Sequence, residues 1–233
     1  AIPVYCYVGF NAHRTHYGTW PGEGKYAGKN WAGMCNFPGD GFYTSLGGWT
    51  QLNAHPEGFE KGGSLRQGLN VDASNLDIMD TWYTYDWTVM YKTYETLTVF
   101  NPWDTSKFEP WLCESSEVGT WEKPGVGTCS AVNFTLIPGI LWQDGIPMTA
   151  SDVRFSFWYN RECKSVNYAS AKDYDSAVID NKTLPGKEII SIRFKVLSWL
   201  ATTWCNYIPI MPEHVWSDEY VFRGERGPGV DGN

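Results

Sequence analysis

The first 63 residues most restrict what this chain can fold into, because they hold few of the side chains that build an aliphatic core. They contain 13 of the chain's 24 glycines and 12 aromatic residues, but only five Ile, Leu or Val residues. We expect loops and short strands there, held together by aromatic packing. The packed part of the chain is therefore predicted at 64–223, and the Gly-rich stretch 224–233 is predicted to be a loop.

The overall composition is that of a globular protein. The chain has 233 residues, of which 42% are hydrophobic and 19% are charged, and its net charge is −8. That charge argues against nucleic-acid binding, which takes clustered Lys and Arg. No apolar run approaches the ~18 residues that a membrane helix needs. Aromatic residues make up 16% of the chain, which suits a surface-exposed protein that binds ligands or partners.

The cysteines indicate an oxidising compartment. There are six, and no two of them are spaced CxxC, which argues against zinc ribbons and thioredoxin-like chemistry. An even, scattered set fits structural disulfides, with buried reduced thiols as the alternative. The predicted bridges are Cys6–Cys35, Cys113–Cys129 and Cys163–Cys205. Asn133 and Asn181 each begin an Asn-X-Thr sequon, so both are predicted to carry glycan if the source organism glycosylates its secreted proteins.

Hydrophobic periodicity predicts a mixture of strands and helices. Apolar residues that alternate with polar ones predict strands at 65–71, 132–136 and 190–196. Apolar residues at helical spacing predict helices at 86–97, 149–159, 197–204 and 212–216. Because these elements follow one another irregularly, we expect an α+β (mixed α/β) fold.

Three short sequence motifs predict where two of the helices begin and where the chain turns. Asp86 is a plausible N-cap for the first helix. Asp144-Gly145 predicts the turn of a hairpin, since this dipeptide tolerates positive φ angles. Thr149, followed three residues later by Asp152, is the pattern of a capping box that starts the next helix.

Motifs for catalysis are missing from the sequence. It contains no GxSxG, HExxH, P-loop or GxGxxG. His13 and His16 are spaced HxxH near two cysteines, but a disulfide beside two exposed histidines explains that pattern more simply than a metal site. We therefore expect a protein that is not an enzyme and that holds no metal and no cofactor.

The aromatic run from Trp82 to Trp87 is the best candidate for ligand contact. It lies between a predicted strand and a predicted helix, where loops often carry function. Exposed aromatic faces could stack on sugar rings or cover peptide side chains, and the alternative is a core cluster at the start of the helix. The candidate ligand-binding residues are Trp82, Tyr83, Tyr85 and Asp86.

One long segment resembles a known family. Residues 134–156, FTLIPGILWQDGIPMTASDVRFS, resemble the most characteristic stretch of family 5 extracellular solute-binding proteins, the oligopeptide-, dipeptide- and nickel-binding receptors of ABC importers. Shorter stretches at 69–77, 94–97, 109–118 and 208–216 fall in the family's order, so the resemblance covers about 65–216. Ile137 and Pro138 depart from it, because the family has a basic residue at this point. Residues 1–63 have no counterpart in it.

The resemblance implies the first lobe and small subdomain of a type II periplasmic-binding-protein-like fold, without the second lobe that family members add. It implies a receptor that captures a peptide or related small solute and delivers it to the membrane permease of an ABC importer. Its implied location is extracellular or at the cell surface, or periplasmic if the source has an outer membrane. Since the second lobe supplies much of the family's ligand contact, this chain is expected to bind solutes weakly or not at all. The alternative is a structural subunit of an extracellular surface layer or filament, a homo-polymer joined through 1–63.

Overall fold

The computed structural model describes residues 31–32, 55–56, 58–60, 71–81, 83–101, 104 and 106–222. Some of the predictions above concern residues outside these ranges. They are the organisation of most of 1–63, the strand at 65–71 except its last residue, the Cys6–Cys35 bridge, the His13–His16 pair, Trp82 and the loop at 224–233.

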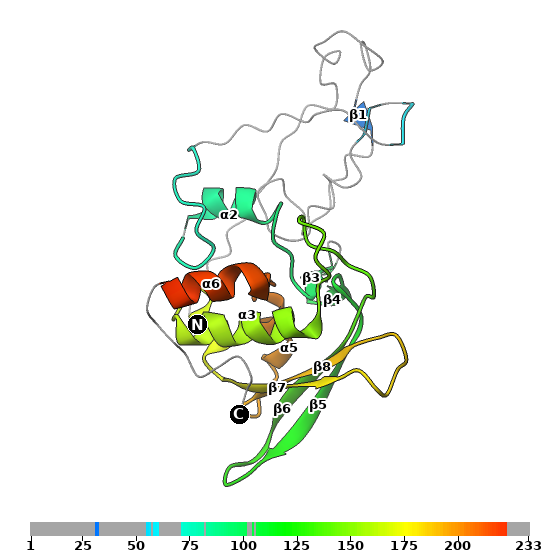
Figure 1. The fold of residues 1–233 in the computed structure, drawn as a ribbon, viewed down its shortest axis with the longest axis vertical. Helices are drawn as coiled ribbons and strands as arrows, with labels where there is room; N and C mark the ends of the chain where they lie inside the picture. Colours follow the sequence, from blue (N-terminus) through cyan, green and yellow to red (C-terminus); the bar gives the residue numbers. More distant parts are fainter. Residues whose placement is uncertain are drawn as a thin grey trace, which may run out of the picture.

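An antiparallel four-stranded sheet forms the centre of the described structure (Figure 1). Its strands are β5 (Cys113–Lys123), β6 (Gly127–Leu136), β7 (Tyr174–Asp180) and β8 (Ile189–Phe194), in the order β5-β6-β8-β7. The alternation of apolar residues correctly predicted both central strands, β6 and β8. Val132, Phe134, Ile190 and Ile192 are fully buried on one face. β8 ends at Phe194, so the predicted strand at 190–196 is two residues too long.

Helices cover the face of the sheet to which these apolar side chains point. The longest helix, α3 (Ala150–Glu162), packs across β7 and β8, and α5 (Ala201–Asn206) packs against β6. The remaining elements are β1 (Trp31–Ala32), β2 (His55–Pro56), α2 (Thr84–Met90), β3 (Thr98–Phe100), β4 (Phe108–Pro110), α4 (Tyr168–Ala171) and α6 (Glu213–Phe222). In Figure 1, α6 and α2 lie on the side of α3 that faces away from the sheet. The opposite face of the sheet, which we call the open face, carries polar side chains such as Asn133 and Ser191.

The turn predicted at Asp144-Gly145 is present. The N–H of Gly145 donates to the carbonyl of Trp142 at 2.9 Å, and Gly145 has φ +86°, a conformation that glycine adopts without strain. The predicted hairpin around this turn is reduced to a single bridge between Leu141 and Pro147. The expected turn is therefore confirmed, while its flanking strands are much shorter than the pattern suggested.

The capping box at the start of α3 is confirmed. The side chain of Thr149 accepts a hydrogen bond from the N–H of Ser151, and the carboxylate of Asp152 accepts one from the N–H of Thr149 at 2.8 Å. These bonds satisfy backbone donors that have no partner within the first helical turn. The helix continues to Glu162, somewhat beyond the predicted end at 159.

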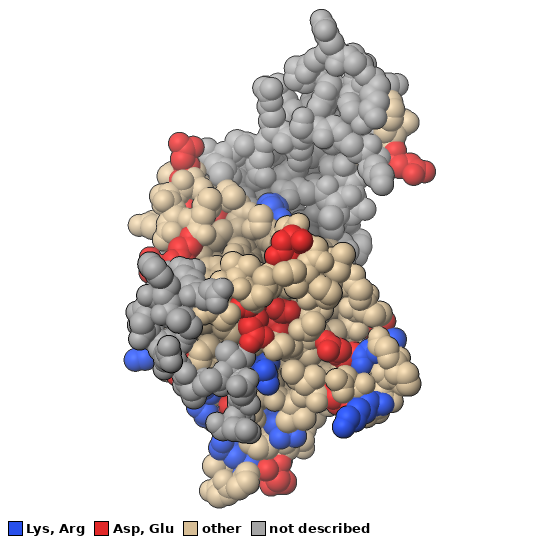
Figure 2. Space-filling model, in the orientation of Figure 1, with Lys and Arg blue, Asp and Glu red and all other residues tan. Residues whose placement is uncertain are grey.

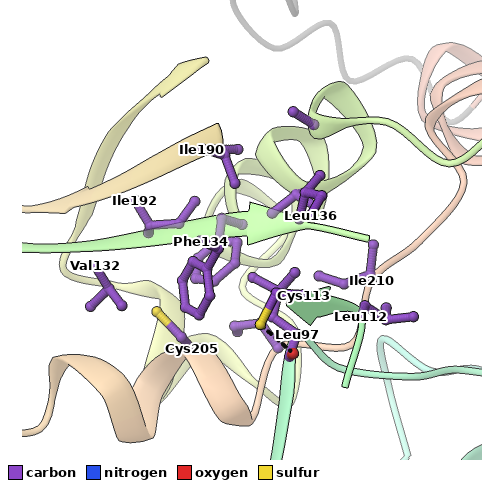
Figure 3. Close-up of a cluster of buried hydrophobic side chains, with 14 of the residues drawn as sticks. Leu97, Leu112, Cys113, Val132, Phe134, Leu136, Ile190, Ile192, Cys205 and Ile210 are labelled. Atoms are coloured by element: carbon purple, nitrogen blue, oxygen red, sulfur yellow. Dashed lines mark hydrogen bonds between the residues drawn. The ribbon is translucent and has the colours of Figure 1, made fainter. Parts of the chain in front are cut away.

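Two clusters of buried side chains hold the described structure together. The larger one, called here the sheet core, lies between the sheet and the helices (Figure 3). Its main members are Leu97, Leu112, Cys113, Val132, Phe134, Leu136, Val153, Phe157, Ile190, Ile192, Phe194, Cys205, Ile208 and Ile210. The smaller one, called the outer core, lies on the other side of α3 and consists of Ile78, Met79, Met90, Phe155, Tyr159 and Met211. α3 is thus buried on two faces.

The predicted helix at 86–97 is wrong at both ends. α2 spans Thr84–Met90 and has Tyr83 as its N-cap, so Asp86 lies in the first turn instead of capping the helix. After Met90 the chain turns, and Leu97 is buried in the sheet core just before β3. The spacing of apolar residues matched a helix, but the β-branched residues Thr98 and Val99 enter a strand that pairs with β4.

The two predicted helices near the C-terminal end differ in outcome. The one at 197–204 starts too early, because α5 begins at Ala201 and Leu197 lies outside it with 66% of its surface exposed. The short helix after Pro212 is confirmed, since α6 begins at Glu213, and it is longer than expected. Among the described helices, none combines the length and the apolar character that crossing a membrane requires.

Two of the predicted disulfides are wrong. Cys113 and Cys129 are both free, and the register places Cys113 opposite Leu136 but Cys129 opposite Trp121. The two cysteines therefore lie near opposite ends of the β5–β6 hairpin, about 25 Å apart at the usual rise per strand residue. A disulfide requires Cα atoms within about 7 Å.

The predicted Cys163–Cys205 bridge fails for a different reason. Cys205 is a free thiol that is fully buried in the sheet core, against β6 (Figure 3). Cys163 follows α3 and packs against the outer core, on the other side of that helix. The body of α3 separates the two cores, so these side chains do not meet.

Candidate functional site

The aromatic segment that the sequence singled out forms the start of α2 and the loop before it. Asp86, one of the four candidates, is buried, and both of its carboxylate oxygens accept hydrogen bonds from that loop. The N–H of Ser74 donates to Oδ1 at 2.7 Å, and the hydroxyl of Thr81 donates to Oδ2 at 2.5 Å. These bonds, that from Thr81 first, lower the pKa of Asp86. Asp86 therefore holds the loop in place and offers little to a ligand.

The tyrosines of this segment are more accessible. Tyr83 exposes 66% of its surface, whereas Tyr85 is half-buried. Trp87 is held inward, because its Nε1–H donates to the carbonyl of Thr81 at 3.0 Å and its ring lies 4.8 Å from that of Tyr91. Of the described candidates, Tyr83 is thus the one whose ring is open to a ligand, and the half-buried ring of Tyr85 lies two residues further along.

The chemistry available at this segment is stacking and hydrogen bonding through a phenol. A tyrosine ring can cover an apolar side chain or the face of a sugar, while its hydroxyl makes a polar contact. Among the residues that the structure describes, no group of three or more His, Cys, Asp or Glu side chains is arranged to hold a metal ion. The arrangement fits a binding surface, and we assign it no catalytic step.

A second cluster of functional interest was missed by the sequence analysis. On the open face of the sheet, the indole of Trp121 crosses from β5 to β8, where its Nε1–H donates to the carbonyl of Phe194 at 3.0 Å. The guanidinium of Arg193 and the ammonium of Lys123 lie 5.1 Å and 5.5 Å from the centre of a Trp121 ring. Lys123 also pairs with Asp175 of β7. No sequence signal could have found this cluster, because its members come from three strands that only the sheet brings together.

Charged side chains are mixed over the visible surface. Acidic groups are spread over the whole face shown in Figure 2, while most Lys and Arg side chains lie on its lower part. One polar contact joins α6 to the turn before α3, where Nε2 of His214 lies 2.7 Å from Oδ2 of Asp144. The hydrogen bond with His214 lowers the pKa of Asp144.

The similarity that we find to known proteins is to solved structures. No protein-family model matches the chain, and no curated protein matches it. The periplasmic oligopeptide-binding protein of an ABC transporter from Thermotoga maritima, solved with bound mannohexaose, is 27% identical with a TM-score of 0.40. That match covers 56% of this chain and 23% of the other.

Two further structures show the same kind of partial similarity. NikZ from Campylobacter jejuni, in complex with Ni(L-His), is 22% identical with a TM-score of 0.41, over 54% of this chain and 23% of its own. The ABC transporter substrate-binding protein CtaP from Listeria monocytogenes is 14% identical with a TM-score of 0.45, over 63% of this chain and 28% of its own. The chain is thus structurally similar to family 5 solute-binding proteins over about half its own length, and it spans about a quarter of theirs.

Proposed function

We propose that this chain belongs to the solute-binding component of an ABC-type import system. In this proposal it acts outside the cytoplasm, captures a peptide or a related solute, and passes it to a membrane permease. The observation that carries the proposal is the segment 134–156. Its sequence resembles the most characteristic stretch of family 5 receptors, and its structure uses that stretch as one continuous unit from β6 through the turn into α3.

Five distinctive residues of that unit have an identifiable structural task. Phe134 is buried in the sheet core, Gly139 and Gly145 adopt positive φ angles, and Thr149 and Asp152 form the capping box. The resemblance therefore concerns residues that fix a backbone path. It supports a shared scaffold and says nothing of which solute is bound.

Ligand contact in this proposal comes from the start of α2, with Tyr83 as its principal exposed side chain. Tyr83 exposes 66% of its surface to solvent beside a helix that Asp86 fastens to the preceding loop. An aromatic side chain with few rotatable bonds stacks on a ligand at a small cost in conformational entropy. Tyr85 and Trp82 remain proposed members of the same surface.

Calorimetry on the native protein tests this function. The probes are a mixture of short peptides and mannohexaose, the sugar bound by the Thermotoga protein. We expect saturable binding of at least one probe, weakened about tenfold by Tyr83→Ala through the loss of a stacking contact. The matched control is Tyr168→Ala, which removes an exposed tyrosine from α4. The proposal fails if neither probe binds, and the site assignment fails if both variants bind equally well.

A further inference from the structure

The outer edge of β5 is an open hydrogen-bonding edge within the described part of the chain. The N–H groups of Ser130 and Leu136 on β6 point toward β8 and its flanks, where they donate to the carbonyls of Val196 and Glu188. The odd-numbered residues of β6 therefore bond to β5, whose odd-numbered residues face them in the register. It follows that the backbone groups of Ser116, Val118, Thr120 and Glu122 point away from the sheet.

The opposite edge of the same sheet is protected, which makes the β5 edge stand out. β7 is shorter and carries a register shift between Tyr174 and Ser176. The guanidinium of Arg161 also donates to the carbonyls of Tyr174 and Asp175, at 2.9 Å and 3.4 Å. Bulges and inserted charges are common ways in which proteins block strand addition. β5 is longer, with eleven residues, and its register shift lies at its first residues, between Cys113 and Ser115, although three glutamates and one lysine lie along it.

Apolar side chains lie beside the open edge. Val118 exposes 64% of its surface, and Figure 1 shows that the β5–β6 hairpin extends beyond the helices. Ser198 is bonded to the hydroxyl of Ser130, one strand inside the edge. Its neighbours Leu197 and Trp199 expose 66% and 88% of their surface. Large apolar side chains are thus exposed both on β5 and in the segment that is bonded to β6.

We propose that β5 pairs antiparallel with β5 of a second copy of this chain, about a twofold axis at Gly119. This inference is independent of the solute-binding proposal. The charges select the register. Centring the pair on Val118 would place Glu114 opposite Glu122 of the second copy, on the same face, where like charges destabilise. Centring it on Gly119 gives the longest pairing in which no like charges face each other.

The pairing centred on Gly119 is complementary to itself. Val118 faces Thr120 of the second copy, a pair of β-branched side chains that packs well across strands. Ser115 faces Lys123 of the second copy, and Glu117 faces Trp121, with Lys123 on the diagonal. The sheets of the two copies form one continuous sheet, in which the exposed side chain of Val118 packs across the joint. An exposed strand edge and an exposed apolar side chain are covered together.

The first experiment compares the oligomeric state of the native protein with that of Val118→Pro. Proline at 118 removes an N–H that points out of the sheet, so it leaves the β5–β6 bonds intact while preventing strand addition. Sedimentation equilibrium should show a monomer–dimer equilibrium for the native protein and a dissociation constant at least about tenfold higher for the variant. Ala177→Pro, on the β7 edge, is the matched control and should leave dimerisation unchanged. Ala177 faces Ile192, whose backbone groups point toward β6, so the N–H of Ala177 points away from the sheet. Circular dichroism confirms that each variant is folded.

The second experiment tests the register by cysteine cross-linking. A Cβ at Gly119 would meet only the side-chain amide nitrogen of Asn133, at 3.8 Å, so Gly119→Cys fits the native strand. The twofold axis would bring the two introduced thiols opposite each other, within disulfide reach. Mild oxidation should give a covalent dimer of Gly119→Cys, and neither the native protein nor Val178→Cys should give it. A native protein that is monomeric, or a Gly119→Cys variant that does not cross-link, overturns the proposal, including the case in which another segment of the chain covers β5.

Discussion

Asp86 shows how one carboxylate can be assigned two different roles from its sequence context. It was predicted to cap a helix and to contact a ligand, and in the structure it lies in the first turn of α2 instead of at the N-cap. It is buried, and it accepts one hydrogen bond from a backbone N–H and one from a hydroxyl in the loop before α2. Its place in the first turn also suits the helix dipole, which favours negative charge at the N-terminal end.

The lowered pKa of Asp86 predicts a pH dependence of stability. Because the folded-state pKa lies below the unfolded value, the ionised carboxylate stabilises the protein above about pH 4, and this contribution is lost as pH falls through the folded-state pKa. Asp86→Asn should lower the urea midpoint at pH 7, and the difference from the native protein should shrink toward pH 2. Asp72→Asn, at an exposed position, is the control and should track the native protein throughout. A constant difference at every pH would contradict this assignment.

The buried cysteines give a second prediction at this scale. Burial raises the pKa of the Cys113 and Cys205 thiols, so few thiolates exist at neutral pH and alkylating reagents cannot reach them. Treated with iodoacetamide, the folded protein should leave Cys113, Cys129 and Cys205 unlabelled. All three should be labelled after unfolding in guanidinium without reductant, as mass spectrometry would show. Disulfide-linked peptides that join Cys113 to Cys129, or Cys163 to Cys205, would restore the bridges that the structure rejects.

At the scale of elements, the sequence predicted best where a single face is buried. Phe134 and Ile192 belong to strands whose alternate residues fill the sheet core, so their periodicity is strong. β5 was not predicted, because its residues from Glu114 to Val118 are all exposed and carry no alternation of apolar and polar side chains. It is a strand because its partner β6 is one, and a pairing between neighbouring segments leaves little trace in either sequence alone.

The candidate site was predictable to the same limited extent. Tyr83 could be named as a candidate because an aromatic run stands out in a sequence. Its exposure to solvent could not be predicted, because that exposure depends on where α2 packs. The Trp121–Arg193 contact joins residues far apart in the chain. Nothing in the local sequence of either residue indicates the other.

The capping box yields a prediction for α3. Thr149→Ala removes the oxygen that accepts from the N–H of Ser151, and it should cost about 1 kcal/mol of unfolding free energy. Thr149→Ser keeps that oxygen and should cost much less. Urea unfolding of both variants and the native protein measures the two differences. Equal losses would mean that the methyl group of Thr149, and not its hydroxyl, stabilises this end of the helix.

On the scale of the whole molecule, α3 is the element that joins two bodies of packed side chains. Phe157 stacks near Tyr174 in the sheet core, with ring centres 5.7 Å apart, whereas Phe155 lies 5.1 Å from Tyr159 in the outer core. A buried hydroxyl strengthens the outer connection, because Ser156 accepts from the N–H of Met211 just before α6. The sheet therefore depends on one face of α3, while α2 and α6 depend on another.

This arrangement predicts that two neighbouring substitutions on α3 loosen different parts of the molecule. Each of Phe155→Ala and Phe157→Ala should destabilise the protein by about 3–5 kcal/mol, the usual cost of removing a buried aromatic ring. Hydrogen exchange read by mass spectrometry should then separate them. Phe155→Ala should speed exchange in α2 and α6 while β6 and β8 stay protected, and Phe157→Ala should speed exchange in β6 and β8.

Each variant is the control for the other, because both remove a phenylalanine side chain from α3. If the outer core can open on its own, the free energy of opening measured at its amides is lower than that measured at the amides of the sheet. Phe155→Ala would then increase this difference. If instead both variants speed exchange equally in α2, α6, β6 and β8, the two cores unfold as one cooperative unit. In that case α2, with Tyr83 at its start, is as rigid as the sheet, and any ligand meets a surface that is already formed.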